Sequence, residues 1–114
     1  MAEQKGKNVL TGLGVAAGRA TGIARLLWSP VDGGGLMQGE ILVAPSTDPG
    51  WTPLFLKAAA LVTETGGLIS HGAIVAREFG IPAVVNVAGV MESLANGDRV
   101  VVDGDRGSVL VQCE

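Results

Sequence analysis

Cysteine, histidine and tyrosine are nearly absent from this sequence of 114 residues, which contains one cysteine, one histidine and no tyrosine. Cys113 has no second cysteine with which to pair, so a disulfide scaffold is excluded and a reducing compartment, by default the cytoplasm, is expected. The single histidine, His71, cannot build a histidine-rich metal site, and we expect no metal site on this chain.

Charge and long apolar runs are scarce too. Charged residues make up 17% of the chain and its net charge is −3, so the sequence lacks the basic surface that holds nucleic-acid phosphates. No apolar run approaches the roughly 20 residues of a membrane helix, and no apolar block of signal-peptide length follows the N-terminus. We therefore expect a soluble protein that is not exported and that binds neither nucleic acid nor membranes.

Apolar residues and glycine, in contrast, are plentiful. Hydrophobic residues make up 47% of the chain and the mean hydropathy is +0.42, which is enough to build one hydrophobic core in a chain too short for two domains. The 18 glycines are scattered between apolar segments, which indicates many tight turns. We expect residues 1–9 to be a flexible N-terminus and residues 10–114 to form a single domain.

Strands and helices alternate along the predicted domain. Short apolar or β-branched runs predict strands at 22–28, 40–45, 60–63 and 82–87, and two more around the DGDRG turn within 99–111. Helices are expected from Pro53 to about Ala59 with Thr52 as the N-cap, from His71 to a stop at Gly80, and for one or two turns within 89–97. This order predicts the α/β class, with parallel or mixed strand pairing.

His71 occupies a distinctive position, because it follows the segment TETGGLIS and directly precedes a helical pattern. If Ser70 is the N-cap, His71 is the first helical residue, where free backbone N–H groups and the positive end of the helix dipole favour an anion. The same dipole disfavours an imidazolium ion and so keeps a ring nitrogen lone pair available for attack on phosphorus. The position therefore suits a histidine that becomes phosphorylated.

The residues around His71 could bind the phosphate. Gly66 and Gly67 can adopt positive φ and expose backbone N–H groups to a donor, Ser70 adds a hydroxyl, and Gly72 leaves space beside the imidazole. A structural alternative is that His71 is a solvated or capping residue and the glycine pair is a plain turn. Because the sequence places no second base, metal-ligand cluster or pair of carboxylates beside His71, we favour phosphoryl carriage.

The segment TETGGLISHGAIVAREFGIPAVV resembles the phosphohistidine segment of phosphoenolpyruvate synthases, pyruvate phosphate dikinases, rifampicin phosphotransferases and the sugar-transport Enzyme I. The resemblance extends from about Leu10 to Val111, since GLGVAAGRATGIARLL, ILVAPSTDPGWTPLF and NGDRVVVDGDRGSV are similar to other segments of that family. It implies that residues 10–114 form the family's phosphohistidine domain, a swivelling β/β/α domain of small mixed sheets packed with short helices. It also implies that His71 is phosphorylated, on its Nε2 atom.

Two residues depart from the commonest family pattern. Ile69 stands where many members have a threonine, so the regulatory phosphorylation that the resemblance would suggest cannot occur at this position. Gly72 replaces the usual alanine, which weakens helix propensity by up to about 1 kcal/mol. The GGLxxHG arrangement and the segment TDPGWTPLF are similar to the rifampicin phosphotransferase version of the domain.

The resemblance further implies partner domains. In the family this domain is a phosphocarrier that rotates between an ATP-grasp nucleotide-binding domain and a substrate-binding domain, on which Mg²⁺ and ATP or phosphoenolpyruvate are bound. We therefore expect no cofactor on this chain, and a phosphotransferase of kinase or dikinase type that is not catalytically complete without those domains. Two alternatives stay open: a rifampicin-phosphotransferase-like enzyme, and a free-standing swivelling module with an interaction or regulatory role.

A phosphocarrier needs a surface beside its phosphorylated residue on which a partner can dock. Leu68 and Ile69 are candidates for such a surface, because they immediately precede Ser70 and His71. The alternative is that both are core residues of the loop, since apolar side chains are usually buried.

The helix after His71 has one expected buried arc. Ile74, Val75 and Phe79 share this arc and are expected to face the sheet. Glu78 falls inside it and would need a partner, so we expect a structural ion pair there. Arg77 points elsewhere, and we interpret it as a solvated surface arginine, with the steering of phosphate as the alternative.

Overall fold

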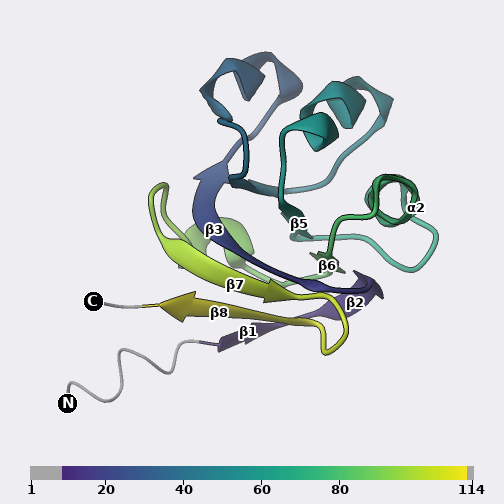
Figure 1. Ribbon diagram of the computed structural model, residues 1–114, viewed down its shortest axis with the longest axis vertical. Coiled ribbons are helices and arrows are strands. Elements are labelled where there is room, and N and C mark those ends of the chain that lie inside the picture. Colours follow the sequence, from purple (N-terminus) through teal and green to yellow (C-terminus); the bar gives the residue numbers. More distant parts are fainter. Residues whose placement is uncertain (1–8, 113–114) are drawn as a thin grey trace.

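Eight strands within residues 9–112, the part of the chain that the computed structural model describes, form one mixed sheet in the order β1-β8-β7-β3-β4-β5-β6-β2 (Figure 1). Short helices pack on this sheet, so the fold belongs to the α/β class that the sequence predicts. Of the predicted flexible segment 1–9, residues 1–8 lie outside the described residues, as does Cys113, and strand β1 begins at Val9.

The sheet consists of an antiparallel part and a parallel part that share β3. Strands β1, β8, β7 and β3 pair antiparallel in that order, whereas β3, β4, β5 and β6 are mutually parallel, and β2 pairs antiparallel with β6. The strands comprise β1 (Val9–Thr11), β2 (Leu13–Ala16), β3 (Arg19–Leu26), β4 (Ile41–Ala44), β5 (Ala60–Thr63), β6 (Ala83–Val85), β7 (Arg99–Asp103) and β8 (Ser108–Gln112).

Strands β1 and β2 lie at the two ends of the strand order although only Gly12 separates them in the chain. The sheet must therefore curl until its two ends approach each other. The backbone N–H of Gly12 donates a hydrogen bond of 2.9 Å to the carbonyl of Gly107, next to β8. A Cβ atom on Gly14 would collide with the carbonyl oxygen of Gly104, so this approach of two backbones requires glycine.

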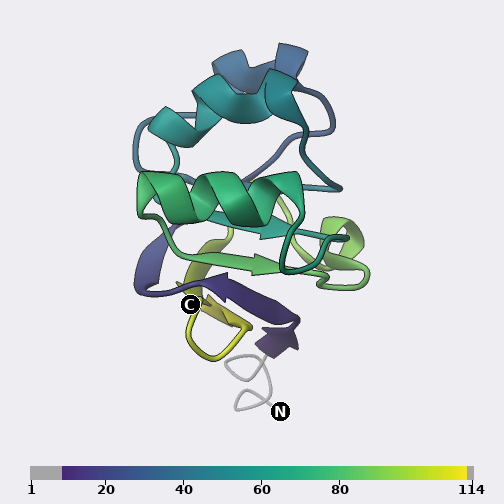
Figure 2. The ribbon, with the colours of Figure 1, turned by 90° about the vertical axis from the view of Figure 1, so that its right-hand side faces the viewer.

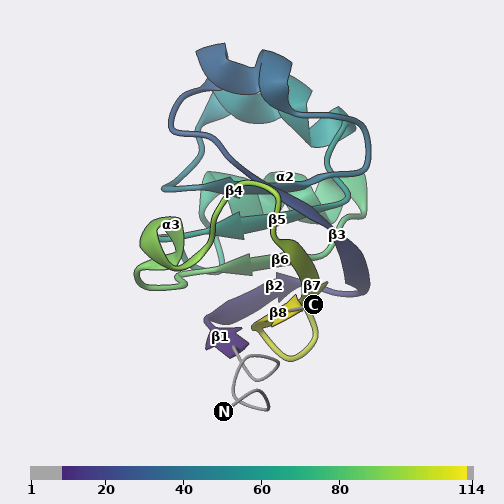
Figure 3. The ribbon, with the colours of Figure 1, turned by 90° about the vertical axis from the view of Figure 1, so that its left-hand side faces the viewer.

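The two faces of the parallel strands carry separate cores. One face packs against α2 (His71–Phe79) and the 3-10 helix η2 (Pro49–Leu56), which lie side by side in Figure 2. The other face packs against α3 (Val90–Ser93) and the strands β7 and β8 (Figure 3). Because both faces are covered, all four residues of β4 and of β5 are buried, which explains why every residue of these strands except Thr63 is apolar.

A second 3-10 helix, η1 (Pro30–Gly35), contacts η2 at the end of the molecule. It occupies the turn-rich connection that follows β3. None of the helices in residues 9–112 is long and apolar enough to cross a bilayer.

Most predicted elements are present, with shifted boundaries at the N-terminal side. The predicted strands at 40–45 and 60–63 are confirmed as β4 and β5, and the predicted helix from His71 to Gly80 is confirmed as α2. Gly80 ends α2 in the left-handed conformation, with φ of 73°. Strand β3 starts at Arg19 and ends at Leu26 rather than spanning 22–28, and the sequence did not indicate β1 or β2.

The predicted start of the helix after β4 is wrong. The observed 3-10 helix η2 begins at Pro49, its N-cap is Asp48 rather than Thr52, and Pro53 lies inside it. The side chain of Asp48 accepts a hydrogen bond of 2.9 Å from the backbone N–H of Gly50. A capping residue followed by proline marks a helix start, and the sequence offers two such pairs. Asp48 and Pro49 form the pair that is used, and Thr52 and Pro53 form the pair that was predicted.

The predicted buried arc of α2 is only partly correct. Val75 is buried, but Ile74 is 43% exposed and Phe79 is 37% exposed. Glu78 is exposed and takes part in no ion pair among the described residues. The face of α2 that meets the sheet consists mainly of small residues, which let the helix approach the strands closely: Gly72, Ala73 and Ala76.

An ion pair between Arg25 and Glu40 makes the stability of the fold depend on pH. The Arg25 Nη2 atom lies 2.8 Å from Glu40 Oε2, and the backbone N–H of Met37 donates to Glu40 Oε1 at 2.9 Å. The hydrogen bond from the guanidinium is the main cause that lowers the pKa of Glu40. A lowered pKa stabilises the fold above the ordinary glutamate value of about 4.3, and this stabilisation is lost as the pH falls through the lowered pKa.

We therefore predict that Glu40→Gln lowers the free energy of unfolding at neutral pH and removes part of its decrease in acid. Urea unfolding followed at a series of pH values from neutral to acid measures both effects. Glu78→Gln makes the same chemical change at an exposed carboxylate and should leave the pH dependence of the free energy of unfolding unchanged. Identical pH profiles for wild type and Glu40→Gln would contradict the assignment.

Candidate functional site

His71 is the first residue of α2, and its half-buried ring lies between two threonines. The Nδ1 atom is 3.0 Å from Oγ1 of Thr47, and the Nε2 atom is 3.4 Å from Oγ1 of Thr52. The ring of Phe55 meets the imidazole edge-on, with 6.1 Å between the centroids and an interplanar angle of 89°. These contacts hold the imidazole in a defined orientation, in contrast to a freely solvated side chain.

The groups that contact the imidazole come from the connection between β4 and β5. Thr47 follows the end of β4, and Thr52 and Phe55 belong to η2, which packs along α2. Neither threonine is among the site residues predicted from the sequence, in which Thr52 is expected to be a helix cap. The local sequence could not have identified them, because 24 and 19 residues separate Thr47 and Thr52 from His71 and only the packing of η2 on α2 brings them together.

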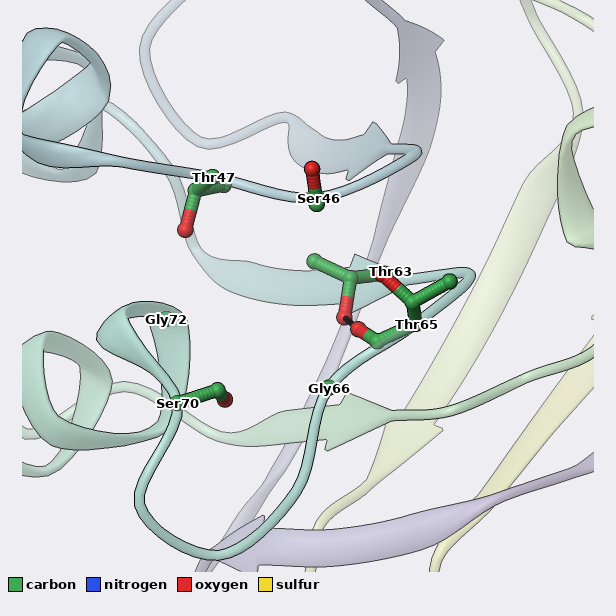
Figure 4. Close-up of a pocket in the computed structure, with 7 residues that line it drawn as sticks. All are labelled: Ser46, Thr47, Thr63, Thr65, Gly66, Ser70 and Gly72. Atoms are coloured by element: carbon green, nitrogen blue, oxygen red, sulfur yellow. Dashed lines mark hydrogen bonds between the residues drawn. The ribbon is translucent and has the colours of Figure 1, made fainter.

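A small pocket opens beside the start of α2. Its volume is about 120 Å³, and hydroxyl-bearing residues and glycines line it. Figure 4 shows that these residues come from three segments: the chain after β4, the end of β5 with the loop that follows it, and the start of α2. The lining residues are Ser46, Thr47, Thr63, Thr65, Gly66, Ser70 and Gly72.

Three of the four predicted phosphate-binding residues meet at this pocket. Gly66, Ser70 and Gly72 line it, whereas Gly67 does not. Gly66 has a φ of 130°, a conformation that favours glycine, as expected, whereas Gly67 does not adopt positive φ. A Cβ on Gly72 would lie 2.9 Å from Leu61 Cδ2 and 3.1 Å from Thr47 Oγ1, so close packing accounts for this glycine.

Ser70 is the N-cap residue of α2, but its side chain forms no cap hydrogen bond. The Ser70 hydroxyl donates instead to the carbonyl oxygen of Gly67, at 2.9 Å. The N–H groups in the first turn of α2 therefore have no side-chain cap, and they lie beside the imidazole and the pocket.

Arg77 fixes the loop that leads to His71. Its Nη2 donates to the carbonyl oxygen of Leu68 at 2.7 Å, and its Nη1 donates to the carbonyl oxygen of Val15 at 2.8 Å. Val15 lies at the register shift between β2 and β6, where the regular ladder of hydrogen bonds is interrupted. Arg77 is exposed, as expected from the sequence, but its two hydrogen bonds also make it a structural clamp between α2, β2 and the loop.

The apolar residues before His71 are exposed. Leu68 is 60% exposed and Ile69 is 85% exposed, so the alternative that both belong to the core is wrong. They lie on the loop that leads into α2, directly beside Ser70 and His71.

No group of three or more histidine, cysteine, aspartate or glutamate side chains within residues 9–112 is arranged to hold a metal ion. Among the residues that line the pocket, none carries a charge. The chemistry of the site within the described part of the chain thus rests on one imidazole, hydroxyl groups and backbone N–H groups.

Comparison with known proteins supports the resemblance. The family model described as PEP-utilising enzyme, mobile domain, matches residues 36–107. The chain is 46% identical over 102 residues to a rifampicin phosphotransferase from Bacillus cereus, covering 90% of this chain and 12% of that protein. It is 44% identical over 110 residues to a phosphoenolpyruvate synthase from Aquifex aeolicus, covering 94% of this chain and 13% of that protein. The chain thus spans about an eighth of the length of these relatives.

Solved structures share the fold. A solution structure of Enzyme I superimposes with a TM-score of 0.63 at 33% identity, covering 73% of this chain and 34% of that chain. The holo-form of aconitase X from Thermococcus kodakaraensis superimposes with a TM-score of 0.71 at 21% identity, covering 93% of this chain and 99% of that chain. The second likeness concerns the fold alone.

We predict that Arg77→Met lowers the free energy of unfolding by about 1–3 kcal/mol, because two carbonyl oxygens lose a charged hydrogen-bond donor. Amide hydrogen exchange in the loop 64–70 should accelerate at the same time. Chemical denaturation and exchange measured by NMR test the two effects.

Two further variants serve as controls for Arg77. Arg77→Lys keeps the charge but cannot reach both carbonyl oxygens, so it should lie between wild type and Arg77→Met. Arg106→Met removes an arginine whose side chain is 84% exposed and 4.0 Å from its partner Asp103, and it should change stability by less than about 0.5 kcal/mol. If Arg77→Met were as mild as Arg106→Met, the clamp would have no energetic role.

Proposed function

Because the chain belongs to the family of PEP-utilising enzyme mobile domains, we propose that it is a phosphocarrier domain in which His71 accepts a phosphoryl group and passes it on. The observation that carries this proposal is the placement of the imidazole. His71 is the first residue of α2, Thr47 holds one ring nitrogen, and within residues 9–112 a single hydroxyl, at 3.4 Å, contacts the other.

The proposed chemistry needs no second base on this chain. A neutral imidazole attacks phosphorus with the lone pair of Nε2, while Nδ1 keeps its proton in a hydrogen bond to Thr47 Oγ1. The negative charge that arrives on the ring lies beside the uncapped N–H groups of the first turn of α2, where the helix dipole favours an anion.

We propose that Gly66, Gly67, Ser70 and Gly72 assist in binding the phosphate. The pocket lined by Gly66, Ser70 and Gly72 supports this role for three of them. Ser70 would have to turn its hydroxyl away from the carbonyl oxygen of Gly67 in order to donate to a phosphoryl oxygen. Gly67 leaves open space where a side chain would stand, which would allow a donor to approach the loop.

The donor and acceptor sites are proposed to lie on other domains. Phosphoryl transfer requires cations that neutralise the phosphates, and no charged residue lines the pocket beside His71. We propose an ATP-grasp domain that binds ATP with Mg²⁺ and a second domain that binds phosphoenolpyruvate, pyruvate or another acceptor. The small share of each relative that this chain covers supports a carrier within a larger phosphotransferase.

The reaction of that larger enzyme is proposed to be of the phosphoenolpyruvate synthase or dikinase type. A rifampicin phosphotransferase reaction is the alternative. The chain is 46% identical to a rifampicin phosphotransferase and 44% identical to a phosphoenolpyruvate synthase, and this difference is too small to decide between the two reactions. Gly72 does not separate them either, because its packing against Leu61 and Thr47 explains it without reference to the acceptor.

We predict that this chain takes up acid-labile, base-stable phosphate when it is mixed with the nucleotide-binding and substrate-binding domains and with labelled phosphoenolpyruvate or ATP. His71→Ala should abolish the labelling, since His71 is the only histidine of the chain. Scintillation counting after acid and alkaline treatment distinguishes phosphohistidine from phosphoserine. Label that survives in His71→Ala, or wild-type chain that stays unlabelled with either donor, would refute the proposal.

Docking of a partner domain is proposed to use Leu68 and Ile69. We predict that Ile69→Glu raises the KM for phosphorylation by the partner domain about tenfold, because a charge replaces an apolar contact at the centre of the interface. Stability should change by less than about 0.5 kcal/mol, since Ile69 is 85% exposed.

Val31→Glu is the matched control for Ile69→Glu. Val31 is 87% exposed and lies in η1, which supplies none of the residues that contact the imidazole or line the pocket, so this variant should be phosphorylated like wild type. Phosphoramidate, a small donor that needs no partner, should phosphorylate both variants at the wild-type rate. If Ile69→Glu and Val31→Glu had the same KM for phosphorylation by the partner domain, Ile69 would not belong to the docking surface.

A further inference from the structure

The two nitrogens of the His71 ring are contacted by two hydroxyls of one short segment, TDPGWT (residues 47–52). The contact of Nδ1 with Thr47 Oγ1, at 3.0 Å, has the length of an ordinary hydrogen bond. The contact of Nε2 with Thr52 Oγ1, at 3.4 Å, is at the long limit. The ring is therefore anchored firmly at Nδ1 and covered loosely at Nε2.

A neutral imidazole has one N–H donor and one lone pair, whereas a threonine hydroxyl can donate or accept. Two hydrogen-bond directions are therefore compatible with these distances. In one, Nδ1–H donates to Thr47 and the Thr52 hydroxyl donates to the lone pair of Nε2. In the other, Thr47 donates to Nδ1 and Nε2–H donates to Thr52. Only the first direction leaves a nucleophilic lone pair on Nε2.

We propose that Thr52 is a positioning residue for phosphoryl transfer at Nε2. Its hydroxyl donates to the Nε2 lone pair in the resting protein and so selects the Nδ1–H tautomer, and it donates to a phosphoryl oxygen once the phosphoryl group arrives. This inference rests on the proposed function, because it takes His71 as the phosphorylated residue.

The Nε2 lone pair forms the bond to phosphorus, and the bond between phosphorus and the donor oxygen breaks with its electron pair remaining on that oxygen. Nδ1 retains its proton against Thr47, so the ring carries a positive charge beside the phosphoryl group. The donor is the nucleotide or enol phosphate of the partner domains, and Thr52 loses no proton.

The surroundings of Thr52 hold its hydroxyl in place. Its neighbour Trp51 is 4% exposed and Phe55, one turn further on, is 1% exposed, so both anchor η2 in the core. Asp48 caps the start of η2 through the N–H of Gly50. Thr52 itself is half-buried on the side of η2 that meets α2, with its hydroxyl 3.4 Å from Nε2 of His71.

Ring nitrogen NMR of the purified chain tests the tautomer directly. The chain has one histidine, so one set of imidazole signals reports on His71. In wild type at mildly alkaline pH we expect Nδ1 to be protonated and Nε2 to be unprotonated. Thr52→Val preserves the shape of the side chain but removes the hydroxyl, and it should shift the ring toward the Nε2–H tautomer that free imidazole favours in water.

The rate of phosphorylation by phosphoramidate provides a second readout. Thr52→Val should slow it about threefold to tenfold, which corresponds to the loss of one hydrogen bond in the transition state. Thr52→Ser retains the hydroxyl and should restore both the tautomer and the rate. Thr21→Val makes the same change at an exposed residue of β3 and should match wild type in both measurements.

Wild-type tautomer and rate in a folded Thr52→Val, or a failure of Thr52→Ser to restore them, would overturn the inference. A wild-type NMR fingerprint away from His71 establishes that each variant is folded. The test needs no partner domain, so it is separate from the labelling of His71, whose failure would refute the proposed function instead.

Discussion

The site depends on the parallel pairing of β4, β5 and β6. Parallel neighbours need crossover connections, and successive crossovers of the same hand between adjacent strands lie on the same face of the sheet. Helix η2 lies in the crossover from β4 to β5 and α2 in the crossover from β5 to β6, so the two helices must pack side by side. Because the two helices are neighbours, Thr47 and Thr52 of the first crossover contact His71 of the second crossover.

The part of the site that sequence analysis predicted is the part encoded within one contiguous segment. His71, the glycine loop and the stop at Gly80 are local patterns that follow from capping and turn chemistry. The threonines that contact the imidazole were not predictable in this way, because their role exists only once two crossovers have packed together. The partners of Arg77 were missed for the same reason, since one of them is a carbonyl oxygen freed by a register shift in β2.

The fold was predicted best where strands are buried on both faces. Strands β4 and β5 are fully buried and apolar except for Thr63, and they were predicted within a residue or two. Strands β1 and β2 are partly exposed, and Gly12 and Gly14 interrupt their apolar pattern. The face of α2 was assigned wrongly at Ile74 and Phe79, because large apolar residues were taken to mark the buried side. A helix that packs closely on a sheet needs small residues on the buried side instead. Glycine and alanine are less hydrophobic than isoleucine and phenylalanine, so a prediction based on hydrophobicity overlooks them.

The single residue between β1 and β2 has a consequence for how the domain comes apart. These strands terminate the two ends of the strand order, and Gly12 couples them covalently. Detachment of either terminal strand strains the pairing of the other, so the link couples the unfolding of the antiparallel and parallel parts. The chain connection at Gly12 thereby adds cooperativity to the unfolding of the sheet.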